Sequence, residues 1–246
     1  MKRAYCLLFL CAVFVLFSAC SRQDYYVDPQ PTETVAEETL QPTVPATLPV
    51  VEVATEPVIP PAPDSDAEFV RILDYIPSAA QDLRYATENN FTGTQIYTFY
   101  EAYLRYGTVK KLMMVAEELA QQGLYLKIWD GFRPVSAQFT LWEVCPDPTY
   151  VANPEKGFSS HSRGNTVDLT LVDENGQELE MPTGFDDFSA KANRDYSDCI
   201  ETAATNALLL EEIMEKYGFS GYFGEWWHFS DTESYPVEKE FQPNAG

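Results

Sequence analysis

Histidine is the scarcest chemically active side chain in this sequence, because its 246 residues contain only two, His161 and His228. Positive charge is scarce as well: 16 Lys and Arg stand against 38 Asp and Glu, which gives a net charge of -22. A chain with this charge repels phosphate backbones and anionic surfaces, so nucleic-acid binding is excluded as its function. Any chemistry that requires an imidazole depends on these two histidines.

Cysteine is rare in the part of the chain that can form a domain. Cys6, Cys11 and Cys20 lie in or directly after an N-terminal apolar run, which leaves Cys145 and Cys199. An exported pair can form a disulfide or remain as two buried thiols, and the sequence leaves both possibilities open. The domain has no further cysteine that lies near a histidine, so a thiol nucleophile is excluded.

The N-terminal apolar run predicts export. Two basic residues precede residues 4–19, a run too short for a comfortable membrane span, and the run ends directly before Cys20. Ser18 and Ala19 resemble a bacterial lipobox, in which the cysteine is lipidated, although Phe17 stands where leucine is usual. We therefore expect a signal peptide at residues 1–20 and a membrane-anchored lipoprotein that faces the cell wall or periplasm. A plain secreted protein or an uncleaved anchor is the alternative.

The segment after Cys20 lacks glycine and has few large apolar residues. Residues 21–66 are rich in Pro, Thr, Val and Glu, and the chain has no glycine before Gly93. Such a composition buries too little surface to offset its conformational entropy, so a disordered, rather stiff tether is expected. At about 3.1 Å per residue it spans on the order of 140 Å. Residues 67–246 remain, enough for one domain with a proper core.

Both histidines have carboxylates nearby. Asp168 follows His161, and Glu225 precedes His228 by three residues. A catalytic zinc site takes three protein ligands and leaves the fourth position to water, so His161, Asp168 and His228 are sufficient to bind one Zn²⁺. Glu225 is then placed to act as general base. Two ordinary hydrogen-bonded histidines are the less favoured alternative, because each histidine lies beside a suitable carboxylate.

The spacing of these residues makes two structural predictions. Residues 165–172 alternate apolar and polar side chains, as in a strand, and Asp168 falls on the polar face. We expect a loop hinged at Gly164 to return the first histidine toward it. Residues three apart on a regular strand face opposite sides, so a bulge or turn must separate Glu225 from His228.

These residues also carry a family resemblance. The patterns S-x-H-x-x-G-x-x-x-D and E-x-W-H resemble the zinc D,D-peptidases that cut D-alanyl-D-alanine, and the longer matches at residues 159–164 and 225–229 resemble the D-Ala-D-Ala dipeptidase branch known from vancomycin resistance. Thr166 stands where that family usually has alanine, which leaves every metal ligand in place. The resemblance implies an α+β fold of the D,D-peptidase or hedgehog type, one Zn²⁺ per chain and a small dipeptide substrate.

The same resemblance suggests roles for further residues. Arg133, in the sequence Asp-Gly-Phe-Arg-Pro, matches an arginine that lies over the substrate carbonyl and stabilises the oxyanion. A surface ion pair with the aspartate of this motif is the alternative. Tyr85 and Asp186 are candidates for the ammonium end of a dipeptide, and Ser159 for its carboxylate end. Otherwise Tyr85 is a core residue and Asp186 a solvated loop acid.

The periodicity of the remaining sequence predicts the elements that carry these residues. We expect helices at 108–122, capped by Thr108, and 201–217; strands at 124–129, 165–172, 219–223 and 226–229; a hairpin turn at 173–176 with a returning strand at 177–181; and a helix whose first residue is Pro134. These elements predict an α+β domain in which a small, largely antiparallel sheet is flanked by helices, with the metal in a cleft over the sheet.

Two rival functions stay open at this point. One is a zinc D,D- or L,D-carboxypeptidase that trims longer peptidoglycan stem peptides, and the other is a non-catalytic, zinc-stabilised wall-binding module. The resistance dipeptidases act in the cytoplasm, whereas this chain carries an export signal. We therefore expect it to act on peptides outside the membrane, during wall turnover.

Overall fold

The computed structural model describes residues 58–244. The predicted signal peptide, the lipidation site at Cys20 and most of the predicted tether lie outside the described residues. Within residues 58–244, none of the helices combines the length and the apolar character that a membrane span requires. The final residues of the predicted tether contact the domain, because the carbonyl of Pro61 accepts a hydrogen bond from Tyr75 Oη at 3.0 Å.

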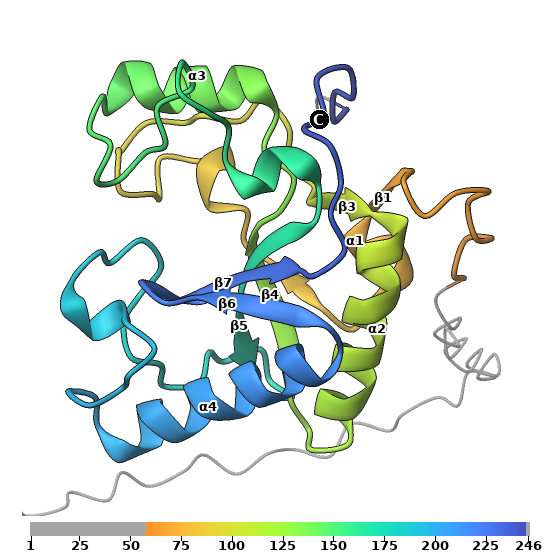
Figure 1. Ribbon diagram of the computed structural model, residues 1–246. Helices are drawn as coiled ribbons and strands as arrows, with labels where there is room; N and C mark the ends of the chain where they lie inside the picture. The colour runs from red at the N-terminus through yellow and green to blue at the C-terminus, as the bar shows by residue number, and fades with distance from the viewer. Residues whose placement is uncertain (1–57, 245–246) are drawn as a thin grey trace, which may run out of the picture. The chain divides into compact units, whose positions relative to one another are not determined.

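A five-stranded sheet forms the centre of the domain (Figure 1). Its order is β2 (Ala80–Gln81), β4 (Tyr125–Asp130), β5 (Thr166–Val172), β7 (Glu225–Asp231) and β6 (Phe219–Tyr222). Only β2 and β4 are parallel, and every other neighbouring pair is antiparallel. The strands β1 (Phe69–Arg71) and β3 (Tyr103–Arg105) form a separate antiparallel pair. The predicted small, mostly antiparallel sheet is therefore confirmed.

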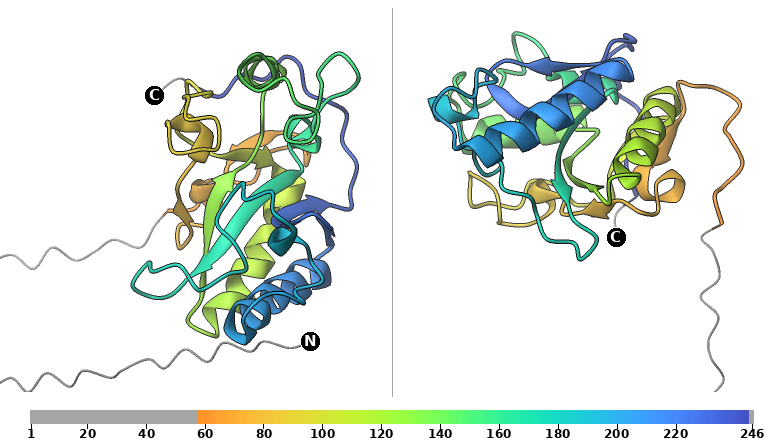
Figure 2. Two further views of the ribbon diagram at one scale, coloured as in Figure 1. Left: turned by 90° about the vertical axis from the view of Figure 1, so that its left-hand side faces the viewer. Right: turned by 90° about the horizontal axis from the view of Figure 1, so that it is seen from below.

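Helices flank this sheet. The α-helices are α1 (Ile72–Tyr75), α2 (Tyr106–Ala120), α3 (Val135–Val144) and α4 (Glu201–Lys216), and the short 3₁₀ helices are η1 (Arg84–Ala86), η2 (Ser160–Arg163) and η3 (Ala190–Ala192). The long helices α2 and α4 contact each other as well as the sheet (Figure 2). Helix α3 lies at the opposite end of the domain from α4 (Figure 1). This arrangement confirms the α+β class.

Burial fixes the register of the central strand β5. Val167, Leu169 and Leu171 are fully buried and belong to the main hydrophobic core. Burying one such side chain contributes about 1.5–3 kcal/mol. A slip of one residue would place Asp168 in that core, so the apolar face strongly specifies which way the carboxylate points.

Several local predictions differ from the structure. Helix α2 begins at Tyr106, and Thr108 is not its cap, because its hydroxyl donates to Asp231 at 2.9 Å. The predicted returning strand at 177–181 is reduced to one bridge, Val172 with Glu178. The turn before it forms as expected and is closed by side-chain hydrogen bonds to Asp173.

The structure also settles where α3 begins and whether the two cysteines of the domain are bridged. Pro134 caps α3 and is not its first residue, because its ψ of 146° is not helical. Cys145 and Cys199 are both free and partly buried, so the disulfide alternative is wrong.

Candidate metal centre and active site

Two of the predicted ligands lie opposite each other on neighbouring strands. Asp168 of β5 and His228 of β7 are register partners. Directly opposed residues of an antiparallel pair have their Cβ atoms about 5 Å apart, close enough for the side chains to meet. His228 Nδ1 lies 3.0 Å from Asp168 Oδ1. The sheet itself therefore brings two of the three predicted ligands together.

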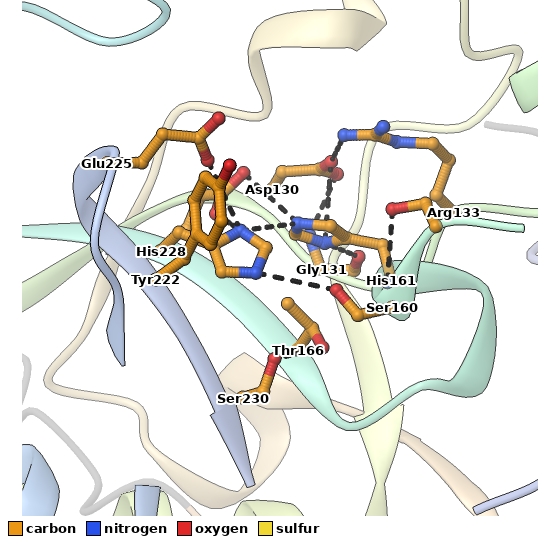
Figure 3. A network of polar contacts seen from close by, with 12 residues as sticks. Asp130, Gly131, Arg133, Ser160, His161, Thr166, Tyr222, Glu225, His228 and Ser230 are labelled. Carbon is orange, nitrogen blue, oxygen red and sulfur yellow. Dashed lines mark hydrogen bonds and ion pairs between the residues drawn. The ribbon is translucent and has the colours of Figure 1, made fainter. Parts of the chain in front are cut away.

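The third ligand comes from the 3₁₀ turn η2. Ser159 caps this turn by accepting the backbone N–H of His161 at 3.3 Å, and Gly164 ends it with a φ of 75°. The turn brings His161 Nε2 to 3.3 Å from Asp168 Oδ2. The same nitrogen lies 3.4 Å from His228 Nδ1 (Figure 3). The predicted Gly164 hinge is confirmed, and the three predicted ligands converge.

The donor atoms fit a bound cation. His161 Nδ1 lies 2.8 Å from the Gly131 carbonyl oxygen, which can only accept a hydrogen bond. In the neutral ring that nitrogen therefore carries the hydrogen, and Nε2 presents a lone pair. Asp168 Oδ1 is buried and lies 3.0 Å from His228 Nδ1, but it accepts no hydrogen bond. One ligand atom from each of the three residues lies within 4.8 Å of the other two. The His161 Nε2–His228 Nδ1 separation of 3.4 Å agrees with the edge of about 3.3–3.4 Å expected for a tetrahedral zinc site.

The charges around these atoms also favour a cation. Burial alone disfavours the charged form of His161, but the Asp168 and Asp130 carboxylates outweigh it and raise the pKa of the imidazole. Burial likewise disfavours the Asp168 carboxylate, yet the two histidines hold its pKa well below the usual range. An ionised carboxylate between two imidazole nitrogens is the electrostatic environment that a divalent metal requires.

Glu225 reaches this centre through a bulge in β7. The β6–β7 register shifts at Tyr222, which pairs with Glu225, while the preceding Gly221 pairs with Phe229. The predicted bulge between Glu225 and His228 is thereby confirmed. Glu225 Oε2 lies 3.5 Å from His228 Nδ1. Burial raises the pKa of Glu225, against the opposing effect of His228, which moves it toward the range suited to a general base.

Arg133 is held by a buried carboxylate. Asp130 is fully buried and accepts hydrogen bonds from Arg133 Nη2 at 2.7 Å and from Tyr97 Oη at 2.7 Å. The Arg133 side chain is only 12% exposed. The alternative of a surface ion pair is therefore wrong, because the guanidinium is fixed inside the site.

Tyr85 and Asp186 form a second polar pair in the same site. Tyr85 Oη donates to Asp186 Oδ2 at 2.8 Å, and the Arg133 guanidinium lies 5.0 Å from the centre of the Tyr85 ring. Burial raises the pKa of Asp186 to about 8. Asp186 is thus not the solvated acid of the alternative interpretation.

All eight predicted site residues line one pocket of about 320 Å³, a size suited to a small ligand. Ser159 lies on its wall with the metal ligands, and Tyr150, Phe188 and Tyr222 contribute aromatic rings. Phe91 packs on Phe188 with ring centroids 5.3 Å apart, which braces that part of the wall. One small pocket therefore combines three side chains that could hold a metal ion, the Glu225 carboxylate beside them and a fixed guanidinium.

Comparison with known proteins decides the family. Residues 65–244 match the peptidase M15 family described as D-Ala-D-Ala dipeptidase. The chain belongs to this family. The D-alanyl-D-alanine dipeptidase of Escherichia coli (strain K12) is 38% identical over 69% of this chain and 89% of its own length. That of Enterococcus faecalis (strain ATCC 700802 / V583) is 35% identical over 63% and 87%.

A solved structure shows a weaker similarity to this chain. VanYB in complex with D-alanine-D-alanine shares 16% identity with this family member, over 54% of this chain and 73% of that chain, with a TM-score of 0.36. The predicted family resemblance is confirmed by the sequence relatives.

Residues beyond the predicted set support the site of this dipeptidase-family chain. Asp130 orients Arg133, and Ser160 Oγ lies 3.4 Å from His228 Nε2. Asp130 belongs to the motif that contains Arg133, so its proximity was visible in the sequence, but its burial was not. Ser160 lies next to His161, and no pattern in the sequence indicates that it contacts the other histidine.

A C-terminal strap, residues 232–241, passes the turn that positions the first histidine. The Ser162 carbonyl accepts the backbone N–H of Glu238 at 2.7 Å, and Arg163 donates to the Tyr235 carbonyl at 2.7 Å. These two hydrogen bonds anchor η2, which is not part of the sheet. In this family member, the segment that follows His228 therefore helps to hold His161 in place.

Proposed function

We propose that this chain is a zinc-dependent dipeptidase that hydrolyses D-Ala-D-Ala. The observation that carries the proposal is the convergence of His161 Nε2, His228 Nδ1 and the Asp168 carboxylate, with Glu225 3.5 Å from His228 Nδ1. These three ligands would hold Zn²⁺. The bound ion supplies a Lewis acid and lowers the pKa of water.

The side chains of the pocket divide the remaining work. Glu225 accepts the proton of the attacking water as the new C–O bond forms, and returns it to the leaving amine as the C–N bond breaks. Arg133 donates hydrogen bonds to the carbonyl oxygen as negative charge develops there. Because Asp130 fixes the guanidinium in advance, little reorganisation accompanies the reaction.

The substrate ends require complementary charges. A free dipeptide carries an ammonium and a carboxylate a few ångströms apart, and the pocket must meet both. Asp186, oriented by Tyr85, is assigned to the ammonium group, and Ser159 with neighbouring backbone N–H groups to the carboxylate. Binding of an ammonium favours the ionised form of Asp186, whose pKa burial otherwise raises to about 8.

A panel of peptides tests this function. The metal content of the purified protein is measured, and its hydrolysis of D-Ala-D-Ala is compared with that of L-Ala-L-Ala and a stem pentapeptide. We expect one Zn²⁺ per chain and a preference for the free D,D-dipeptide. Faster cleavage of the pentapeptide would identify a carboxypeptidase instead, and zinc binding without hydrolysis would identify a wall-binding module.

Glu225→Gln tests the assignment of the general base. Loss of general-base catalysis lowers kcat by about 100- to 10,000-fold, while zinc content stays at one ion per chain because Glu225 is not a ligand. The matched variant His228→Gln removes a ligand and should lose the metal as well. Full turnover by Glu225→Gln would contradict the mechanism.

We also propose that the protein is exported, lipidated at Cys20 and active outside the membrane. The basic residues before the apolar run at 4–19, and the small residues before Cys20, support this. Cys20→Ala should move the activity from the membrane fraction to the soluble exported fraction. Dipeptidase activity confined to the cytosol of cells that express the full chain would contradict it.

A further inference from the structure

The bulge in β7 leaves backbone carbonyls without a strand partner. In β6, Gly221 pairs with Phe229 and the next residue, Tyr222, pairs with Glu225. Residues 226–228 of β7 therefore have no pairing partner in β6. Carbonyls two residues apart on a strand point to the same side, and those of Trp226 and His228 point away from β5. Buried carbonyls require a donor.

Arg194, in the loop between η3 and α4, supplies these donors. Its Nη2 donates to the carbonyls of Trp226 and His228, both at 2.9 Å. Its Nε donates to the Tyr222 carbonyl at 3.0 Å, and its backbone N–H to that of Phe223 at 3.0 Å. One residue therefore makes four hydrogen bonds to the turn and bulge that carry Glu225, in place of the missing part of β6.

The surroundings of Arg194 are built for a guanidinium. The side chain is 6% exposed, lies 3.2 Å from the Glu211 carboxylate, and places its Cζ 4.3 Å from the centre of the Phe229 ring. At Gly221 a Cβ would overlap the guanidinium, so the adjacent strand leaves space for it only because that residue is glycine. A lysine has neither the planar fork nor the five donors that these contacts use.

We propose that Arg194 is a positioning residue that holds Glu225 and His228 on the same side of β7. Without its hydrogen bonds, the bulge can relax toward regular pairing, in which residues three apart face opposite sides. Arg194 acts through the backbone, because its hydrogen bonds reach the carbonyls of this segment and not the imidazole or carboxylate atoms. The effect on metal binding rests only on the zinc site of the proposed function, whereas the catalytic consequence rests on its hydrolytic activity as well.

Arg194→Lys tests this role with a variant that keeps the positive charge. The dissociation constant for Zn²⁺ is measured by competition with a chelator, at a temperature where circular dichroism shows the metal-free protein folded. Outer-sphere partners of metal ligands typically change affinity or activity by 10- to 100-fold. We expect zinc binding weaker by about this factor, a fall in kcat for D-Ala-D-Ala and a KM within about twofold of wild type.

Tyr196→Phe is the matched control. Tyr196 lies in the same loop and donates at 2.7 Å to Glu211 Oε2, the oxygen that also lies 3.2 Å from Arg194 Nη1. It makes no bond to the bulge, so Tyr196→Phe loosens Glu211 and removes none of the four hydrogen bonds that Arg194 makes there. It should lower the unfolding temperature and leave zinc affinity and kcat unchanged. Gly221→Ala is a second perturbation of Arg194, because it displaces the guanidinium without changing its charge, and should weaken zinc binding in the same direction.

Zinc affinity within twofold of wild type in Arg194→Lys or in Gly221→Ala overturns the proposal. An equal loss of affinity in Tyr196→Phe also overturns it, since general destabilisation would then explain the effect. If the wild-type protein binds zinc but does not hydrolyse D-Ala-D-Ala, the proposed function fails, and the zinc affinities still decide the role of Arg194.

Discussion

Asp130→Asn removes the negative charge of the carboxylate and nearly keeps its size and shape, so it tests the contribution of the charge alone. Asp130 is fully buried, and its Oδ2 accepts from Arg133 Nη2 at 2.7 Å. Asparagine can still accept from Tyr97 and from the Gly131 N–H, but it presents a neutral group to the guanidinium. Removing one partner of a buried ion pair costs about 3–5 kcal/mol, because the other charge stays buried and uncompensated.

The assay is thermal and urea unfolding of the metal-free protein, together with steady-state kinetics. A domain of this size loses about 2–4 °C in Tm per kcal/mol, so Tm should fall by roughly 6–20 °C. Turnover should fall by up to about 100- to 1000-fold, the effect of losing one fixed oxyanion donor. KM should change less, because the effect falls mainly on the transition state.

A double-mutant cycle supplies the control. Adding Arg133→Met to Asp130→Asn removes the stranded charge, so the double variant should be more stable than the sum of the two single effects predicts. The reasoning is refuted if Asp130→Asn unfolds within about 1 kcal/mol of wild type, or if the two effects are additive.

Three further predictions concern the same region. Burial raises the pKa of Asp186 to about 8 from 3.8, so its contribution to stability is present below pH 4 and lost as the pH rises toward 8. Asp186→Asn should flatten this fall by up to about 1.4 kcal/mol per pH unit in urea unfolding of the metal-free protein, and an unchanged slope would contradict it. Gly164→Ala should lower Tm and weaken zinc binding, because φ is 75° and a Cβ would overlap the Phe69 ring; wild-type values for both would count against it. Thr166→Ala removes a hydroxyl 2.9 Å from Ser230 Oγ and should cost about 1 kcal/mol of stability with kcat unchanged, so a large fall in kcat would show a direct role.

The convergence of the three predicted ligands could be predicted from the sequence because it depends on short-range patterns. Alternation along 165–172 places Asp168 on the face opposite the core, and Gly164 allows the turn that returns His161. Two strands joined by a short turn bring His228 to the edge of β5. Each of these steps follows from a local rule of strand or turn geometry.

The supporting residues could not be predicted in the same way. The burial of Asp130 depends on Tyr97, which reaches it from 33 positions earlier. Arg194 belongs to no motif, and only the three-dimensional course of β6 and β7 shows which carbonyls it meets. Charged residues in loops are usually solvated, so their composition carries no signal of such contacts.

The C-terminal strap has a practical consequence for shortened versions of the protein. A chain that stops after β7 would retain His161, Asp168, His228 and every other assigned side chain, yet it would lose the Glu238 N–H that meets the Ser162 carbonyl. We expect such a truncated chain to form its sheet but to bind the metal ion with lower affinity. Expression boundaries for this enzyme are therefore better chosen beyond Phe241 than at the last recognisable motif.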